Sequence, residues 1–193
     1  MMLAKFDFRK KPTDWQINPD GWCEGATYLP SPNYGPRPAA IDISLIVVHN
    51  ISLPAGQFGG GYIQDLFLNR LNCELHPSFS ELRELKVSSH FVILRDGALL
   101  QCVSTLERAW HAGLSTFEGR SGCNDFSIGI ELEGTDDLAF EPQQYQTLAT
   151  LCEVLLQRFP IAHIVGHNEI APGRKTDPGP CFDWAHLQDL LRT

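Results

Sequence analysis

One short segment restricts the fold more than any other part of the chain. Residues from Ile43 to Val48 are apolar at every position except Ser44. A continuous apolar run is typical of a strand that is covered on both faces, whereas a half-exposed strand alternates apolar and polar residues. We therefore predict a central strand of an α/β protein here. The run ends at His49 and Asn50, and polar side chains that follow a buried strand are where α/β proteins place their chemistry.

A second segment, from Ile164 to Pro180, carries a dense set of polar groups. It contains His167 and, further on, Asp177, which Arg174 and Lys175 precede. The proline and glycine residues between and after them disfavour a helix or a continuing strand, so we predict a loop. A loop that holds an imidazole, a carboxylate and two cations is a candidate functional site.

Four of the seven histidines, namely His49, His90, His111 and His167, are candidates for chemistry. His49 and His167 each stand near the end of a strand-like run and each precede an asparagine, which suggests two strand ends at one sheet edge. With Asp177 they would supply two nitrogens and one oxygen and leave a fourth position open, as catalytic zinc requires. These residues are far apart in sequence, so the spacing alone leaves structural or hydrogen-bonding histidines as the alternative.

Apolar periodicity predicts further helices and strands along the chain. The helices are expected over residues 62–71, 141–159 and 183–191, and the strands over residues 87–94, 98–103, 126–133 and 161–165. Arg95-Asp96-Gly97, between two of these strands, is a hairpin signal. Residues 1–20 show no such pattern, so we expect an N-terminal extension there and one domain over residues 21–193.

The strand expected over residues 126–133 places two carboxylates on one face. Strict alternation predicts that Ser127, Gly129, Glu131 and Glu133 point one way, and that Phe126, Ile128, Ile130 and Leu132 point the other way. The glycine leaves room beside the two glutamates. Either of them could act as a general base, so Glu133 is the alternative to Glu131.

Composition limits the classes of partner and compartment. A net charge of −8 argues against a general nucleic-acid binder, and no apolar run approaches the ~18 residues of a membrane span. The first residues show no signal peptide, and the six cysteines form no CxxC pair, so we expect reduced thiols in the cytoplasm. The glycine-rich segment 55–61 lacks the lysine and the spacing of a nucleotide-binding loop.

Five longer strings stand in a fixed order along the chain. They are LIVVHNISLPAGQFGG, VSSHFVILRDGALLQ, RAWHAG, CNDFSIGIELEGTD and GHNEIAPGRKTDPGP. Together they resemble the AmpD family of N-acetylmuramyl-L-alanine amidases, from about Gly21 to the C-terminal helix. The resemblance implies a mixed central β-sheet flanked by helices, as in peptidoglycan recognition proteins. It also implies hydrolysis of the amide between N-acetylmuramic acid and L-alanine, with 1,6-anhydromuropeptides as preferred substrates in cell-wall recycling.

The resemblance also implies roles for single residues. Zn²⁺ would be held by His49, His167 and Asp177, while Glu131 and Lys175 would be catalytic. The substrate contacts that we expect are Asn50, Lys86, Trp110, His111 and Arg174. Lys86 stands where an arginine is common in the family, which keeps the charge but loses the planar fork that binds a carboxylate through two hydrogen bonds.

Two other function classes stay open from the sequence. A non-catalytic peptidoglycan-binding module could share the fold, but we would expect it to lack a metal ligand or the lysine. A lytic amidase that acts on intact cell wall would be expected to carry an export signal or a wall-anchoring domain. We expect a monomer whose partner is a muropeptide substrate, with no nucleic-acid or membrane partner.

Overall fold

A six-stranded mixed sheet with the order β1-β5-β4-β9-β3-β10 forms the centre of the structure, a computed structural model that describes residues 15–192. The strands are β1 (Thr27–Tyr28), β3 (Leu45–Ile51), β4 (Phe91–Ile93), β5 (Leu99–Gln101), β9 (Ser127–Glu133) and β10 (His163–Gly166). β4, β9, β3 and β10 pair in parallel, so their carboxyl ends lie at the same edge. β5 is antiparallel to β4 and parallel to β1. The expected mixed central sheet is confirmed.

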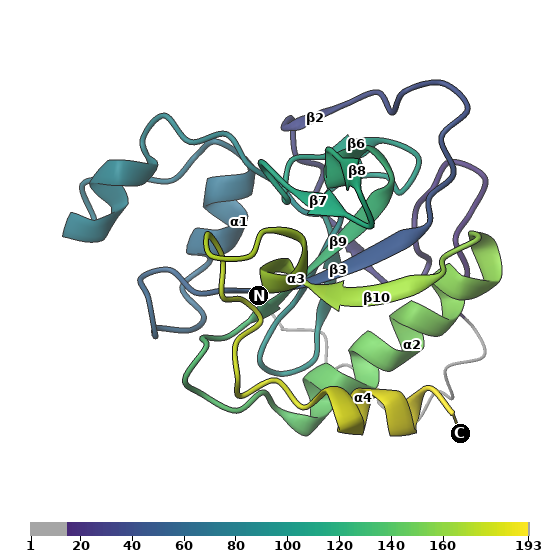
Figure 1. Ribbon diagram of the computed structural model, residues 1–193. Helices are drawn as coiled ribbons and strands as arrows, with labels where there is room; N and C mark the ends of the chain where they lie inside the picture. The colour runs from purple at the N-terminus through teal and green to yellow at the C-terminus, as the bar shows by residue number, and fades with distance from the viewer. Residues whose placement is uncertain (1–14, 193) are drawn as a thin grey trace.

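Helices and irregular segments cover the sheet on both faces, as Figure 1 shows. Ile46 and Val48 point into the larger apolar cluster, which α2 (Pro142–Arg158) and α4 (Trp184–Leu190) complete. Leu45 and Val47 point the opposite way, into a second cluster that includes a residue of α3 (His167–Ile170). The prediction of a strand buried on both faces is therefore confirmed.

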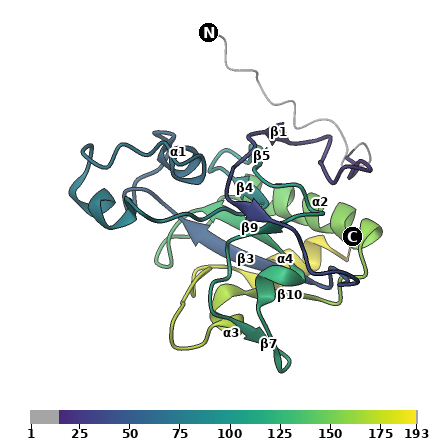
Figure 2. The ribbon, with the colours of Figure 1, turned by 90° about the horizontal axis from the view of Figure 1, so that it is seen from above.

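The second face of the sheet also carries the smaller elements, which Figure 2 shows from above. α1 (Tyr62–Phe67) packs there against Val92 of β4 in a third apolar cluster. Two short antiparallel pairs accompany it, β2 (Tyr34–Gly35) with β6 (Arg108–Ala109), and β7 (Thr116–Phe117) with β8 (Arg120–Ser121). The 3₁₀ helices are η2 (Pro77–Leu82) and η3 (Cys123–Asp125).

Most of the predicted elements occur with shorter bounds than expected. The hairpin of β4 and β5 turns at Arg95-Asp96-Gly97, where the Leu94 amide donates to the Ala98 carbonyl at 3.0 Å. α1 ends at Phe67 rather than at residue 71. Pro142 occupies the first turn of α2, and the Asp183 carboxylate caps α4 by accepting from the His186 amide at 2.9 Å.

The segment 164–180 is not a loop throughout, contrary to our prediction. β10 continues to Gly166, and one helical turn, α3, follows at once. The first proline of the segment is Pro172, so nothing before it prevents this turn. The Glu169 carboxylate accepts from the Gly166 amide at 2.9 Å and stabilises the start of the helix.

The predicted alternation along residues 126–133 fails at its first residue. Ile128, Ile130 and Leu132 lie in the larger cluster on the side of α2, as expected. Phe126 lies instead in the cluster of Leu45 on the opposite face. The reason is that Phe126 caps the end of η3, and the strand begins only at the next residue.

The expected N-terminal extension, residues 1–20, is described only from Trp15. Trp15 and Ile17 pack against the larger cluster, and Ile17 forms a β-bridge with Cys23. The boundary at residue 20 stays a prediction. Among the helices of residues 15–192, none combines the length and apolar character needed to cross a bilayer.

Candidate metal centre and active site

The carboxyl edge of the parallel strands brings the three predicted metal ligands together. His49 lies near the end of β3, and His167 follows β10 directly as the first residue of α3. β10 and β3 are paired in parallel, so the two histidines reach the same end of the sheet. Asp177 joins them from the following loop, whose Asp177 carbonyl accepts from the Asn168 amide at 3.0 Å. The three residues are therefore close in space although they are far apart in sequence.

The three side chains point their ligand atoms at one another. His49 Nδ1 lies 2.9 Å from His167 Nδ1, and Asp177 Oδ2 lies 3.0 Å from each of these nitrogens. A tetrahedral ion with bonds of ~2.0–2.1 Å separates its ligand atoms by roughly 3.3 Å. The donor set of two imidazoles and one carboxylate suits Zn²⁺ and leaves one position for water or substrate. The residues present therefore fit the implied ion.

The outer nitrogens of both imidazoles have partners that turn the inner nitrogens toward the ion. His167 Nε2 donates to the Ala112 carbonyl at 3.1 Å, which leaves Nδ1 without a proton in the neutral ring. His49 Nε2 lies 2.9 Å from His111 Nδ1. Metal-binding histidines are commonly oriented in this way through their second nitrogen.

The protonation states of the group also fit a metal centre. Burial lowers the pKa of His49 to about 4, against the opposing effect of the Asp177 carboxylate, so this imidazole is neutral near pH 7. Burial by itself would raise the pKa of the Asp177 carboxyl. The neighbouring imidazoles of His167 and His49 outweigh that effect and lower this pKa below its ordinary value. Neutral imidazole and ionised carboxylate are the forms that bind a cation.

Glu131 and Glu133 lie on the same face of β9 but have different surroundings. Glu131 is the register partner of His49, is buried, and its Oε2 has no hydrogen-bond partner within residues 15–192. Burial and then the charge of Asp177 raise the pKa of Glu131 well above its usual value. Glu133 instead accepts from the Gly59 amide at 2.7 Å and from the Arg95 amide at 3.1 Å. The unpaired carboxylate beside the ligands is therefore Glu131.

Lys175 lies on the exposed loop between α3 and Asp177. In the part of the chain that the structure describes, its ammonium has no hydrogen-bond or ion-pair partner, while its backbone amide donates to the Ala171 carbonyl at 3.1 Å. Its charge lowers the pKa values of both His49 and Glu131, although burial has the larger effect on each. The charge of Lys175 thus acts on His49 and Glu131, while its ammonium group is available to contact a bound substrate.

Two residues that we expected to contact substrate also hold the loops of the site in place. The Asn50 amide donates to Asp136 Oδ1 at 2.6 Å and to the Pro178 carbonyl at 3.1 Å. The Arg174 guanidinium donates to the carbonyls of Ala112 and Leu114, both at 2.7 Å. Substrate contact by Asn50 and Arg174 stays a prediction, and each residue has an observed role in loop structure.

The other three predicted substrate contacts lie in different surroundings. The His111 ring lies behind His49 and also contacts Ser127 Oγ at 3.1 Å. Trp110 is half-buried, and its amide donates to the Ser88 hydroxyl at 3.1 Å. Lys86 is exposed in the segment between η2 and β4. Their roles toward substrate stay predictions.

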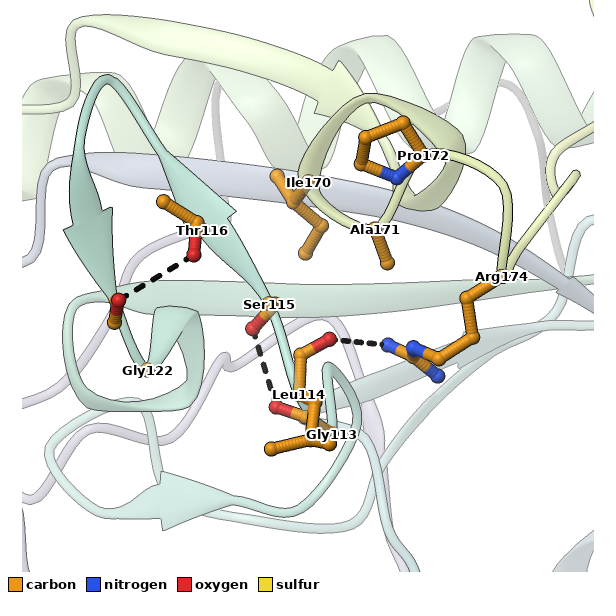
Figure 3. Close-up of a pocket in the computed structure, with 10 residues that line it drawn as sticks. Gly113, Leu114, Ser115, Thr116, Gly122, Ile170, Ala171, Pro172 and Arg174 are labelled. Carbon is orange, nitrogen blue, oxygen red and sulfur yellow. Dashed lines mark hydrogen bonds between the residues drawn. The ribbon is translucent and has the colours of Figure 1, made fainter.

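A pocket of about 530 Å³ lies between the end of α3 and the segment 113–116. Figure 3 shows Ile170, Ala171 and Pro172 from the end of α3 on one side and the segment 113–116 on the other. The Arg174 guanidinium joins the two sides through its hydrogen bond to Leu114. The same guanidinium lies 3.4 Å from His167 Nε2, but His49, His167 and Asp177 are not among the residues that line the pocket.

Comparison with known proteins places this site in a family. The profile of the N-acetylmuramoyl-L-alanine amidase family, Amidase_2, matches residues 39–180, a range that contains every predicted ligand and both predicted catalytic residues. The chain belongs to this family. Within it, the 1,6-anhydro-N-acetylmuramyl-L-alanine amidase AmpD of Escherichia coli (strain K12) is 51% identical over 173 residues, covering 89% of this chain and 94% of the relative.

Solved structures of amidases agree with this family assignment. A crystal structure of a selenomethionine AmpD derivative superposes with a TM-score of 0.87 at 52% identity, covering 89% of this chain and 97% of that one. The amidase AmiD from E. coli, solved with anhydro-N-acetylmuramic acid-L-Ala-D-gamma-Glu-L-Lys, gives a TM-score of 0.59 at 31% identity and covers 79% of this chain and 59% of that one. A Drosophila peptidoglycan recognition protein shares the fold at a TM-score of 0.58 and 16% identity, covering 85% of this chain and 91% of that one.

The structure of this amidase also shows contacts at the site that the sequence analysis did not predict. The four candidate histidines form one group, because the His111 ring packs 5.0 Å from that of His49 and 5.7 Å from that of His90. Arg37 is half-buried, contacts His90 Nε2 at 3.0 Å, and donates to the carbonyls of Thr105, Asn124, Asp125 and Ser127. The proline-rich sequence around Arg37 contains no pattern that predicts these hydrogen bonds. The alternation of β9, in contrast, did place Ser127 and Gly129 on the face of Glu131.

Proposed function

We propose that this chain is a zinc-dependent amidase that hydrolyses the bond between N-acetylmuramic acid and L-alanine, and that it prefers 1,6-anhydromuropeptides. The observation that carries the proposal is the convergence of His49, His167 and Asp177 beside the unpaired carboxylate of Glu131. The activity for which its AmpD relatives are named supports the substrate class, as does the anhydromuropeptide bound to AmiD.

In this proposal the zinc ligands, Glu131 and Lys175 have different roles in amide hydrolysis. When bound to His49, His167 and Asp177, Zn²⁺ supplies a Lewis acid that polarises a carbonyl and increases the acidity of water. Glu131 is placed to accept a proton from the attacking water and to return one to the leaving amine, a role worth about 10²–10⁴-fold in rate. Lys175 would stabilise the negative charge that develops on the scissile oxygen, and such a donor is typically worth ~3 kcal/mol.

The raised pKa of Glu131 bears on this role. Burial and the charge of Asp177 raise it, and a metal cation in the centre would act in the opposite direction by favouring the ionised form. A carboxylate whose pKa is raised is a stronger base than an ordinary glutamate, which suits it to accept a proton from water. Glu133 is less suited to this role, because the backbone amides of Gly59 and Arg95 already hold both of its oxygens.

The proposal extends to the compartment and the assembly state. The six cysteines, all within the described residues, are free thiols, and burial raises the pKa of Cys102 and Cys152 to about 12. Free thiols suit the reducing cytoplasm. A monomer is the assembly state that we propose, since the ligands and Glu131 all come from one chain.

Zinc content and substrate preference together test the proposed function. Purified protein should contain about one zinc per chain, and exhaustive chelation or Asp177→Ala should abolish hydrolysis of an anhydromuropeptide. Asp137→Ala serves as the matched control, because Asp137 is an exposed acid outside the group. Full activity after chelation, or an Asp177→Ala variant with unchanged zinc content, would refute the metal assignment.

The preferred substrate is measured by comparing kcat/KM values. Anhydromuropeptide should be hydrolysed with a higher kcat/KM than the matching muropeptide with a reducing end, and intact sacculi should release little product. A ratio near one, or efficient release from sacculi, would assign the chain to the lytic class of amidase. Zinc binding with no hydrolysis of any of these substrates would favour a binding module.

A further inference from the structure

The imidazole of His111 lies on the side of His49 that faces away from the other two ligands. His49 Nε2 is 2.9 Å from His111 Nδ1, and His111 Nε2 is 3.1 Å from Ser127 Oγ. Ser127 Oγ in turn donates to the Cys123 carbonyl at 2.6 Å. Four groups from β3, β9, η3 and the loop after β6 therefore form one continuous chain of hydrogen bonds.

The carbonyl at the end of this chain determines the direction of every bond in it. A hydroxyl has one hydrogen, and the Ser127 hydroxyl uses it on the Cys123 carbonyl. Ser127 Oγ must then accept from His111, so the proton of His111 is on Nε2. In the neutral ring His111 Nδ1 is an acceptor, and His49 Nε2 must be the donor. His49 Nδ1 is left with its lone pair toward Asp177 and His167.

Gly129 provides the space in which the His111 ring lies. A Cβ atom at Gly129 would lie 2.4 Å from His111 Cγ and 2.6 Å from His111 Nδ1, closer than any real contact. The Gly129 amide donates to His90 Nδ1 at 3.0 Å, which fixes the backbone at this point. The backbone φ of Gly129 is ordinary, so the requirement for glycine comes from the ring and not from the backbone conformation.

We propose that His111 is a positioning residue that fixes the tautomer and orientation of His49 for metal binding, with Ser127 and Gly129 as the parts that hold His111. The proposal rests on the proposed zinc centre. It assigns no contact with substrate to the His111 ring, whose two nitrogens are both used within the protein. Loss of such a partner typically weakens metal binding by about 10–100-fold.

The zinc dissociation constant, measured by competition with a chromogenic chelator, tests the proposal directly. His111→Leu and His111→Asn are a matched pair, because the side chains are similar in size and only the amide can accept from His49 Nε2. The leucine variant should bind zinc about 10–100-fold more weakly than the wild type, and the asparagine variant should recover part of that loss. Equal dissociation constants for all three proteins would overturn the proposal.

A spectroscopic measurement on the zinc-loaded protein decides the tautomers without any use of substrate. In ¹⁵N-labelled wild-type protein near neutral pH, the ring nitrogens of His49 and His111 should each show a protonated Nε2 and an unprotonated Nδ1. In Ser127→Ala the Nδ1-protonated tautomer of His111 should become populated, because its acceptor is gone. A protonated Nδ1 on His49 in the wild type would overturn the proposal.

These measurements separate the failure of the inference from the failure of the zinc centre. If wild-type protein binds zinc and both His111 variants bind it equally well, the positioning role is wrong and the zinc centre stands. If the wild type binds no zinc, the proposed function fails and the positioning role falls with it. Should His111→Leu not fold, Gly129→Ala takes its place, and zinc binding by that variant as tight as in the wild type would count against the proposal.

Discussion

Two carboxylates two positions apart on β9 illustrate how much the immediate surroundings of a residue decide its chemistry. Both glutamates are buried and share a face of the strand. Glu133 has both oxygens occupied by backbone amides, whereas Glu131 keeps one oxygen without a partner in the described residues. The unpaired oxygen of Glu131 is available to a water molecule in the site, whereas the oxygens of Glu133 hold the backbone amides of two loops.

Glutamine substitutions should separate these two roles. Glu131→Gln should retain zinc and the fold but lose about 10²–10⁴-fold in kcat, because an amide cannot accept the proton of water. Glu133→Gln should reduce kcat much less and instead lower the free energy of unfolding by ~1–3 kcal/mol, since one buried amide loses its acceptor. Steady-state kinetics and urea unfolding of both variants check this. A larger loss of kcat in Glu133→Gln would assign the base to Glu133.

Lys175 permits a prediction that distinguishes charge stabilisation from substrate anchoring. Lys175→Ala should lower kcat more than it raises KM, because the ammonium is expected to act on charge that develops only in the transition state. Lys175→Arg keeps the charge and should recover part of kcat. The two constants are measured with anhydromuropeptide. A change in KM alone would make Lys175 an anchor for a substrate carboxylate.

The stability of the metal-free protein should depend on pH through the buried histidines. The pKa of His49 falls from 6.5 to about 4 on folding, so between these values the unfolded chain binds a proton that the folded protein does not. Stability is therefore lost as the pH falls from about 6.5 to about 4, by roughly 3 kcal/mol from this residue. Burial lowers the pKa values of His90 and His111 as well, which adds to the loss.

Urea unfolding of the chelated protein between pH 7.5 and 4.5 measures this dependence. The raised pKa of Glu131 acts with the opposite sign, because the folded state holds that proton as the pH rises above the ordinary value of 4.5. Glu131→Gln cannot titrate, so acid should destabilise this variant more steeply than the wild type. A free energy of unfolding that stays constant across this range would contradict neutral, buried histidines.

Helix α2 meets the sheet through a polar contact as well as an apolar one. Gln144 is fully buried and donates to the carbonyls of Ile93 and Glu133, while its oxygen accepts from the Glu141 amide. One side chain thus joins the start of α2 to the ends of β4 and β9, where the site begins.

Replacing Gln144 should therefore destabilise the fold. Gln144→Leu leaves buried carbonyls without a donor, and we expect a loss of ~1–3 kcal/mol in the free energy of unfolding. Gln146→Leu on the exposed side of the same helix is the control and should change it by less than ~0.5 kcal/mol. Urea unfolding followed by circular dichroism measures both values, and similar losses in the two variants would contradict this role of Gln144.

The elements that could be predicted from the sequence are those with strong periodicity. The apolar run of β3 and the stripe of α2 identified both elements, because packing against a large core needs a regular pattern. The helical turn of α3 was missed, since four residues are too few to show a period. The chain of contacts through His111 and Ser127 could not be predicted either, because it depends on which loop lies behind β3.

At the scale of the whole molecule, the proposed ion would connect distant parts of the chain. His49 lies on a central strand, and Asp177 lies in the loop that leads to the C-terminal helix. A ligand that binds only the folded state stabilises it by mass action, by ~4 kcal/mol when its concentration is a thousand times the dissociation constant. Zinc should therefore stabilise the whole fold and not the site alone.

Thermal unfolding with and without a chelator tests this connection. Chelation should lower the Tm of the wild type and should leave the Tm of Asp177→Ala almost unchanged, because that variant has already lost a ligand. Asp137→Ala should respond to the chelator as the wild type does. An equal effect of chelator on all three proteins would show that the stabilising ion binds elsewhere.

The pairing of β3 with β9 has a consequence for protein design. His49 and Glu131 are register partners on adjacent parallel strands, which lie ~4.8 Å apart in any sheet. The distance between a metal ligand and the base is thus set by backbone geometry that many unrelated proteins already contain. The arrangement could therefore be built into other proteins. It needs a histidine and a glutamate as register partners on two buried parallel strands. It also needs a glycine two residues before the glutamate, which leaves space for a second imidazole such as that of His111.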